Sequence, residues 1–190
     1  MRTLTRFLSP VFAAAILIPL AGAQDAKKDA APKPPVSRSQ ALLDGWNDIG
    51  RKLIAMAEDM PEDKYDSKPN PAQRTFAEQL LHAAGANYFF INPAKGLKAP
   101  STDNVKRADY KTKADVVAYV RKSFADGAEL IKSKGDAGID DLFVDPFSGR
   151  QVRLGDYAWG FVEHSGEHYG QLVVYYRVLG MVPPESRPKK

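Results

Sequence analysis

The chain contains no cysteine among its 190 residues. This absence excludes disulfide bonds, a thiolate nucleophile, a metal site built on cysteine and a lipid-modified cysteine near the N-terminus. Histidine is also scarce, with three in the whole chain. Any transition-metal site therefore has to be built from histidines and carboxylates, and few positions are available for it.

Excess charge of either sign is small. The formal net charge is +4, and it falls to +2 when Arg2 and Arg6 are left out. Proteins that bind nucleic acid usually have a concentrated basic surface. The small net charge of this chain does not indicate such a surface. We expect no nucleic acid among the partners of this protein.

The apolar run nearest the N-terminus is too short for a membrane-spanning helix, which needs roughly 20 apolar residues. It covers residues 7–21, follows Arg2 and Arg6, and is interrupted by two prolines. Residues 21–23, Ala-Gly-Ala, then form the small-x-small pattern that signal peptidase accepts. We predict a signal peptide at residues 1–23, a periplasmic or secreted protein, and no stable membrane anchor. An uncleaved anchor is the competing interpretation.

The composition of the chain changes sharply after residue 36. Residues 24–36 are rich in alanine, lysine and proline and offer little to bury, so we predict a flexible linker there. Residues 37–190 then form one domain, which is long enough to bury its own core.

Within this domain, apolar residues recur at spacings of three and four in four stretches, which predicts four helices. The stretches cover residues 37–60, 75–93, 112–135 and 156–179. Ser37, Thr75 and Thr112 stand where N-caps are expected, and Pro61, Pro93, Gly135 and Gly180 stand where the helices should stop. Residues 143–152 contain turn-forming residues. The expected fold is all-α: a four-helix bundle with a small hairpin or loop insertion before the last helix.

The three histidines lie on predicted apolar faces. His164 and His168 are one turn apart on the last helix, where their Cβ atoms are about 5–6 Å apart. His82 lies among leucines and alanines of the second helix. If these helices are neighbours, the three rings can converge on one ion. The alternative is that the three histidines bind no metal and are hydrogen-bonded residues of the core.

The same segment also matches a second chemistry. His164, Glu167 and His168 spell the inverted zincin peptidase pattern, in which the glutamate is the general base. Such a site needs a further ligand downstream, and Glu185 in a short tail is the available glutamate. We therefore disfavour a peptidase and regard Glu167 as a solvated residue or a partner that orients a histidine ring.

Several motifs together resemble one known family. Residues 163–172, EHSGEHYGQL, precede GMVPP at residues 180–184, and MPEDKY at residues 60–65 precedes TFAEQLLH at residues 75–82. In this order the motifs resemble the DinB-like family, over roughly residues 40–187. The resemblance implies a four-helix bundle that holds a divalent metal ion.

On that resemblance, the metal ligands are His82, His164 and His168. Neutral imidazole suits several divalent ions, of which we expect zinc or nickel first. The implied function is a metal-dependent hydrolase or transferase that acts on a small molecule, and the sequence identifies no catalytic residue. Thiol transfer, known in this superfamily, does not suit an exported protein. The alternative is a non-catalytic bundle that binds metal or another ligand, and pairing of two copies is a further expectation.

Other side chains near the histidines are candidates for a surrounding pocket. Gln79 and Gln171 lie one turn from a histidine and are candidates for hydrogen bonds to a metal-bound water. We expect the aromatic residues of the second and fourth helices to belong to the core. The alternative is that they line a pocket beside the metal. They are Tyr88, Phe89, Phe90, Trp159, Tyr175 and Tyr176.

Overall fold

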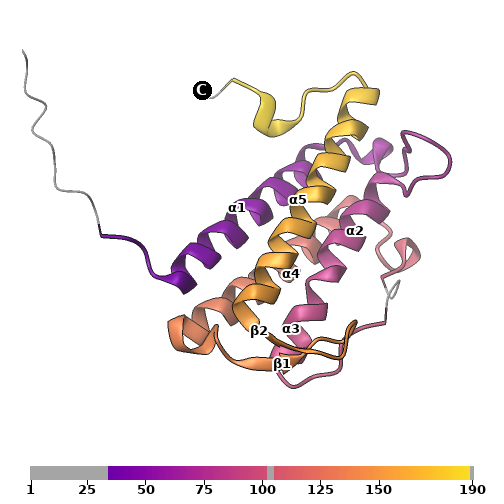
Figure 1. Ribbon diagram of the computed structural model, residues 1–190. Coiled ribbons are helices and arrows are strands. Elements are labelled where there is room, and N and C mark those ends of the chain that lie inside the picture. The colour runs from indigo at the N-terminus through magenta and orange to yellow at the C-terminus, as the bar shows by residue number, and fades with distance from the viewer. Residues whose placement is uncertain (1–33, 102–104, 189–190) are drawn as a thin grey trace, which may run out of the picture. The chain divides into compact units, whose positions relative to one another are not determined.

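The computed structural model describes residues 34–101 and 105–188, so the predicted signal peptide and most of the predicted linker lie outside the described residues. Five α-helical segments make up a bundle of four rods (Figure 1). They are α1 (Arg38–Asp59), α2 (Phe76–Ala86), α3 (Tyr88–Ala94), α4 (Lys113–Gly138) and α5 (Leu154–Val178), with α3 continuing α2. Short 3-10 helices lie outside the α-helices: η1 (Glu62–Lys64), η2 (Arg107–Asp109) and η3 (Pro184–Ser186). The predicted all-α four-helix bundle is confirmed.

The predicted N-caps start three of the helices. Thr75 and Thr112 each form a complete capping box, in which the hydroxyl and the acidic side chain three residues later satisfy two backbone N–H groups. Ser37 accepts a hydrogen bond from the backbone N–H of Gln40, but the Gln40 side chain donates to Asp44 instead of returning to the cap. The local sequence therefore determines where these helices begin.

The second predicted helix is not continuous from Thr75 to Pro93. It is divided at Asn87, and at this point the Ser123 hydroxyl of α4 donates to the Ala84 carbonyl oxygen of α2. The buried Asn87 amide in turn donates to Ser123 at 2.8 Å. Pro93 lies inside α3 and does not end it.

The last two helices also differ in detail from the prediction. Gly135 has a left-handed φ of 58° and interrupts α4, but helical turns resume as far as Gly138. α5 begins at Leu154, two residues earlier than predicted. Gly180 has a φ of 71° just beyond its end, as expected for a glycine that terminates a helix.

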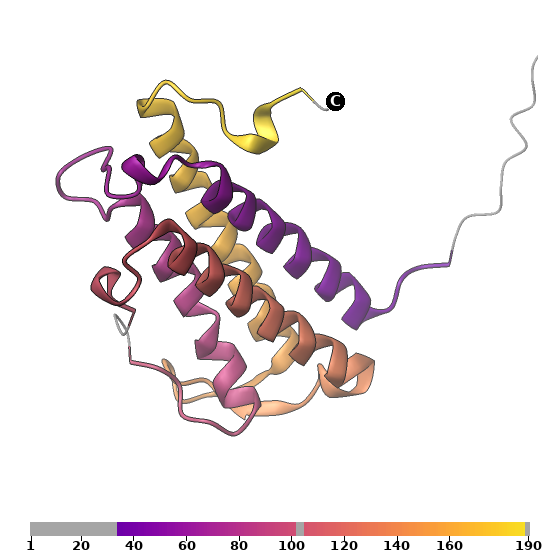
Figure 2. The ribbon, with the colours of Figure 1, turned by 180° about the vertical axis from the view of Figure 1, so that it is seen from behind.

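The four rods occupy the corners of the bundle in the order α1, α4, α2, α5. α1 and α4 are antiparallel, since Arg38 pairs with Asp140 and Lys113 binds the end of α1. α1 runs parallel to α5, while α2 runs antiparallel to α5 (Figures 1 and 2). Consecutive α1 and α2 therefore stand at opposite corners, and both pack against α4 and α5.

Trp46 is the largest side chain in the centre of the core. It is fully buried, and its indole N–H donates to the Phe124 carbonyl oxygen at 2.8 Å. The Trp46 ring also contacts Phe90 and Phe124, with ring centroids 5.2 and 5.5 Å away. Gly127 on α4 faces this ring so closely that a Cβ there would collide with it.

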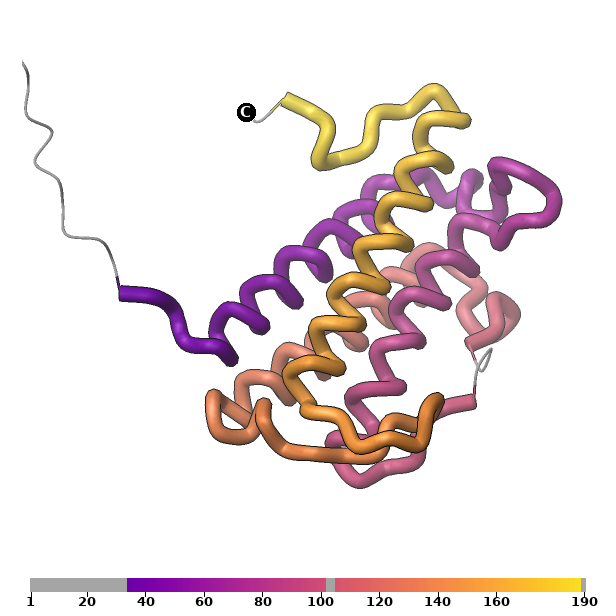
Figure 3. The backbone as a smooth tube through the Cα atoms, in the orientation of Figure 1, coloured from indigo at the N-terminus to yellow at the C-terminus, as the bar shows by residue number. Residues whose placement is uncertain are grey.

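The predicted hairpin before the last helix is confirmed as two antiparallel strands, β1 (Leu142–Val144) and β2 (Gln151–Arg153), which cross one end of the bundle (Figure 3). Its turn is organised by Asp145, whose carboxylate accepts hydrogen bonds from the backbone N–H groups of Phe147 and Ser148. Tyr157 of α5 donates to the same carboxylate at 2.7 Å. The turn is thereby attached to the helix that carries two of the histidines.

No helix within residues 34–101 and 105–188 has the length and apolar character that crossing a membrane requires.

Replacing Gly127 by alanine should reduce the free energy of unfolding by about 1–3 kcal/mol, because the added methyl group overpacks the core against Trp46. Helix propensity alone would favour alanine. Gly160→Ala on α5 is the matched control, since a Cβ there meets nothing within 4 Å, and it should leave stability unchanged or raised. Urea denaturation measures both, and equal effects would contradict the packing described.

Asp145→Asn should destabilise the protein most at neutral pH. Burial alone would raise the pKa of Asp145, but hydrogen bonds from Ser148, Phe147 and Tyr157 outweigh it and lower the pKa to about 2. Because the unfolded carboxyl titrates near 4, the ionised group contributes stability above that pH and loses it as pH falls toward 2. Urea denaturation of both proteins between pH 7 and pH 2.5 should show the difference shrinking. A constant difference would contradict this account.

Candidate metal centre

The antiparallel contact between α2 and α5 is held at both ends by aromatic side chains. At one end the Phe76 ring packs edge-on against Tyr175 and Tyr176, with centroids 6.0 and 6.1 Å away. Beyond the other end of α2, Phe90 of α3, which continues α2, stacks on Phe161 of α5 at 6.1 Å. The residues midway between these contacts therefore face one another across the helix pair.

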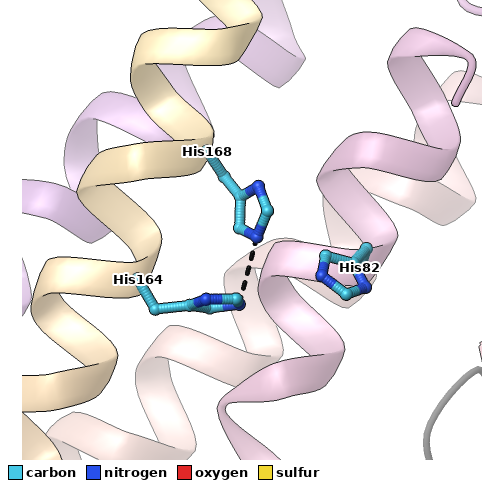
Figure 4. Close-up of side chains that lie close together, drawn as sticks. All are labelled: His82, His164 and His168. Atoms are coloured by element: carbon cyan, nitrogen blue, oxygen red, sulfur yellow. Dashed lines mark hydrogen bonds between the residues drawn. The ribbon is translucent and has the colours of Figure 1, made fainter. Parts of the chain in front are cut away.

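The three histidines occupy this midway position, and the structure brings them together (Figure 4). One ring nitrogen of each lies within 4.8 Å of the others. The Nε2 atoms of His164 and His168 are 3.1 Å apart, and the His82 ring centroid is 4.8 Å from that of His168. Figure 4 shows His82 directed from α2 toward the two rings of α5.

Burial favours the neutral form of the two imidazoles of α5. His168 is 6% exposed and His164 is half-buried. Burial is the main reason that the pKa of each is lowered, and for His164 the neighbouring His168 lowers it further. A neutral imidazole has one nitrogen lone pair available, which is the form that binds a metal ion.

The donor set and its spacing fit a divalent ion. Two nitrogens at about 2.1 Å from one ion, with bond angles of 90–109°, lie about 3.0–3.4 Å apart. The 3.1 Å between the His164 and His168 nitrogens falls in this range. Three neutral nitrogen ligands, with His82 as the third, would leave coordination positions for other groups.

Two glutamines support the ring of His168 on its far side. Gln171 Oε1 is 2.8 Å from His168 Nδ1, and the Gln79 side-chain amide donates to the same Gln171 oxygen. The Gln79 nitrogen also lies 2.5 Å from His168 Nδ1. When Nδ1 carries the proton and donates to Gln171, the Nε2 lone pair faces His164 and His82. Both glutamines therefore contact the ring of His168, and the hydrogen bond to a metal-bound water stays a prediction.

The glutamates of the peptidase pattern lie elsewhere. Glu167 is exposed, and Glu185 forms an ion pair with Arg51 of α1 at 2.5 Å. Within the described part of the chain, the group of possible metal ligands contains the three histidines and no carboxylate. The arrangement therefore does not correspond to an inverted zincin site.

Two hollows adjoin the histidine cluster. A cavity of about 720 Å³ has His82 in its wall, and a second of about 480 Å³ reaches Gln79 and Gln171. Of the candidate aromatic residues, Tyr88 and Phe89 line the first hollow and Tyr175 lines the second. Phe90 and Tyr176 are core residues, and Trp159 is 45% exposed on the outside of α5.

Three further residues of these hollows were not anticipated from the sequence. Arg74 lines both hollows, and Tyr110 and Tyr119 line the larger one. Arg74 and Tyr110 lie in connecting segments, outside any periodic pattern. Their position depends on how the connections fold back against the bundle.

Three imidazoles from two antiparallel helices, in the core of a four-helix bundle, define a bundle protein with a candidate metal centre. The chain belongs to the DinB superfamily, whose family profile matches residues 47–172. None of the curated proteins compared with the chain matches it significantly.

Solved structures share the fold. A DinB-like protein from Bacillus cereus is 18% identical with a TM-score of 0.63, over 76% of this chain and 95% of that one. YfiT from Bacillus subtilis is 15% identical with a TM-score of 0.61, over 80% of this chain and 94% of its own. YfiT is described as a probable metal-dependent hydrolase with an unusual four-helix bundle topology.

Proposed function

We propose that this protein is an exported metal-dependent enzyme, a hydrolase or transferase that acts on a small molecule. Its divalent ion, zinc or nickel in the first instance, is held by His82, His164 and His168. The observation that carries the proposal is the convergence of one nitrogen from each ring within 4.8 Å. The description of YfiT as a metal-dependent hydrolase supports the same class.

The side chains around the ion have separate roles in this proposal. A divalent ion supplies Lewis-acid chemistry, which polarises a carbonyl or phosphoryl oxygen and activates water near neutral pH. Gln171 accepts the Nδ1 proton of His168 and so orients the ring, and Gln79 donates to the same Gln171 oxygen. The cavity beside His82 admits the substrate and has the size of a small-molecule site.

The alternative is a bundle that binds metal or another ligand without turnover. A closed, fully ligated ion would favour that alternative, whereas an open position that meets a reachable cavity favours an enzyme. Three histidine ligands, no nearby carboxylate among the described residues and a cavity beside His82 favour the enzyme. Export is proposed on the leader-like sequence of residues 1–23, and pairing of two copies stays a prediction.

Protein purified without chelators should contain about one zinc or nickel ion per chain, measured by elemental analysis. His164→Ala should reduce this to well below one, because a two-histidine site binds much more weakly. Glu167→Gln is the matched control on the same helix, and its metal content should equal that of the wild type. Circular dichroism verifies that each variant is folded.

Wild-type protein with far less than one ion per chain would contradict the metal centre. Retention of metal in His164→Ala, or an equal loss in Glu167→Gln, would contradict the assignment of His164 as a ligand.

Gln171→Ala should weaken metal binding about tenfold or more, because the proton on His168 Nδ1 loses its acceptor and the ring its orientation. Competition with a chromogenic chelator measures the affinity. Gln73→Ala is the control: this glutamine lines the same hollow as Gln171 but makes no hydrogen bond to a histidine in the described structure. Equal affinities for the three proteins would contradict the role given to Gln171.

A further inference from the structure

The larger hollow beside His82 has two chemically different regions. Its volume of about 720 Å³ lies within the 300–1,000 Å³ typical of small-molecule sites. One region is aromatic and the other is charged, and the histidine cluster lies against the same hollow through His82. A molecule bound there would reach the proposed metal centre with part of its length.

Three tyrosines form the aromatic region. The Tyr119 ring lies between the other two, with its centroid 4.7 Å from that of Tyr110 and 6.2 Å from that of Tyr88. The Tyr88 hydroxyl already donates to Asp126 at 2.7 Å. Burial raises the pKa of Tyr88 and Tyr119, so both remain uncharged at neutral pH. This wall therefore suits a flat or chain-like apolar group.

Cations outnumber acids in the charged region: the lining includes three cationic and two acidic side chains. Arg107 is already paired with Asp66 at 2.9 Å, and Glu78 accepts from the Thr75 backbone N–H within a capping box. The exposed guanidinium of Arg74, in contrast, forms no ion pair within residues 34–101 and 105–188. An anionic group of a ligand could form charge-assisted hydrogen bonds with this guanidinium.

Arg74 contributes to the walls of both hollows. It lines the cavity beside His82 and also the hollow that reaches Gln79 and Gln171. Its backbone is held in place, because Tyr175 donates to the Arg74 carbonyl oxygen at 2.6 Å.

We infer that the substrate is an anionic small molecule with an apolar body. Arg74 binds its carboxylate or a comparable acidic group, and Tyr88, Tyr110 and Tyr119 hold the apolar body. This substrate class rests on the proposed function, because it places the reacting group beside the histidine-bound ion. Arg74 acts in binding and takes no part in the bond-breaking step.

The test compares three ligands that share one apolar body: 4-phenylbutyrate, the neutral 4-phenyl-1-butanol and the cationic 4-phenylbutylamine. Binding to zinc-loaded protein is measured by isothermal titration calorimetry, and the zinc content of every sample is recorded. Wild-type protein should bind the carboxylate at least tenfold more tightly than the alcohol, and the amine most weakly. Arg74→Ala should weaken carboxylate binding about tenfold and leave the alcohol unchanged.

Two further variants separate the charge of Arg74 from general effects. Arg74→Lys keeps the charge and should retain part of the preference for the carboxylate. Arg177→Ala removes an exposed cation of α5 outside both hollows and should bind all three ligands like the wild type. Tyr119→Ala should weaken the alcohol and the carboxylate by the same factor.

Several results would overturn the inference. They are equal binding of carboxylate and alcohol by the wild type, unchanged carboxylate binding in Arg74→Ala, or an equal loss in Arg177→Ala. Failure of the proposed function looks different: the samples take up no zinc, while the preference that depends on Arg74 persists. A zinc-loaded protein without that preference would retain the metal centre and reject the anionic substrate.

Discussion

The register between α2 and α5 is the constraint on which the candidate site depends. Aromatic contacts at both ends of this antiparallel pair, Phe76 with Tyr175 and Phe90 with Phe161, determine which residues meet in the middle. A shift of one helical turn would move His82 about 5.4 Å along α5 and away from the other two rings. The core packing and the histidine cluster are therefore a single structural property.

Neutrality is the second condition of the site, and it arises from the same packing. Burial of the α5 imidazoles opposes their protonation, while Gln171 and Gln79 occupy the Nδ1 side of His168. When the proton of His168 is on Nδ1, its Nε2 lone pair is free to bind a metal ion. Polar groups placed this deep in a bundle need partners, and the two glutamines supply them to His168.

Different parts of the chain form the packed scaffold and the wall of the adjoining hollow. Long helices carry the histidines and the core around Trp46, whereas connecting segments bring Arg74 and Tyr110 to the adjoining hollow. This division is common in binding proteins, because a packed scaffold holds chemical groups accurately while loops vary in shape. Solved structures with 15–18% identity share this fold.

Local sequence determined the features that depend on neighbouring residues: the caps at Thr75 and Thr112, the hairpin around Asp145, and the one-turn spacing of His164 and His168. It did not predict the division at Asn87, whose buried amide donates to Ser123, 36 residues away. Only the tertiary structure brought His82 and Arg74 to the site. Their positions depend on helix packing and chain connections, which no short-range periodicity encodes.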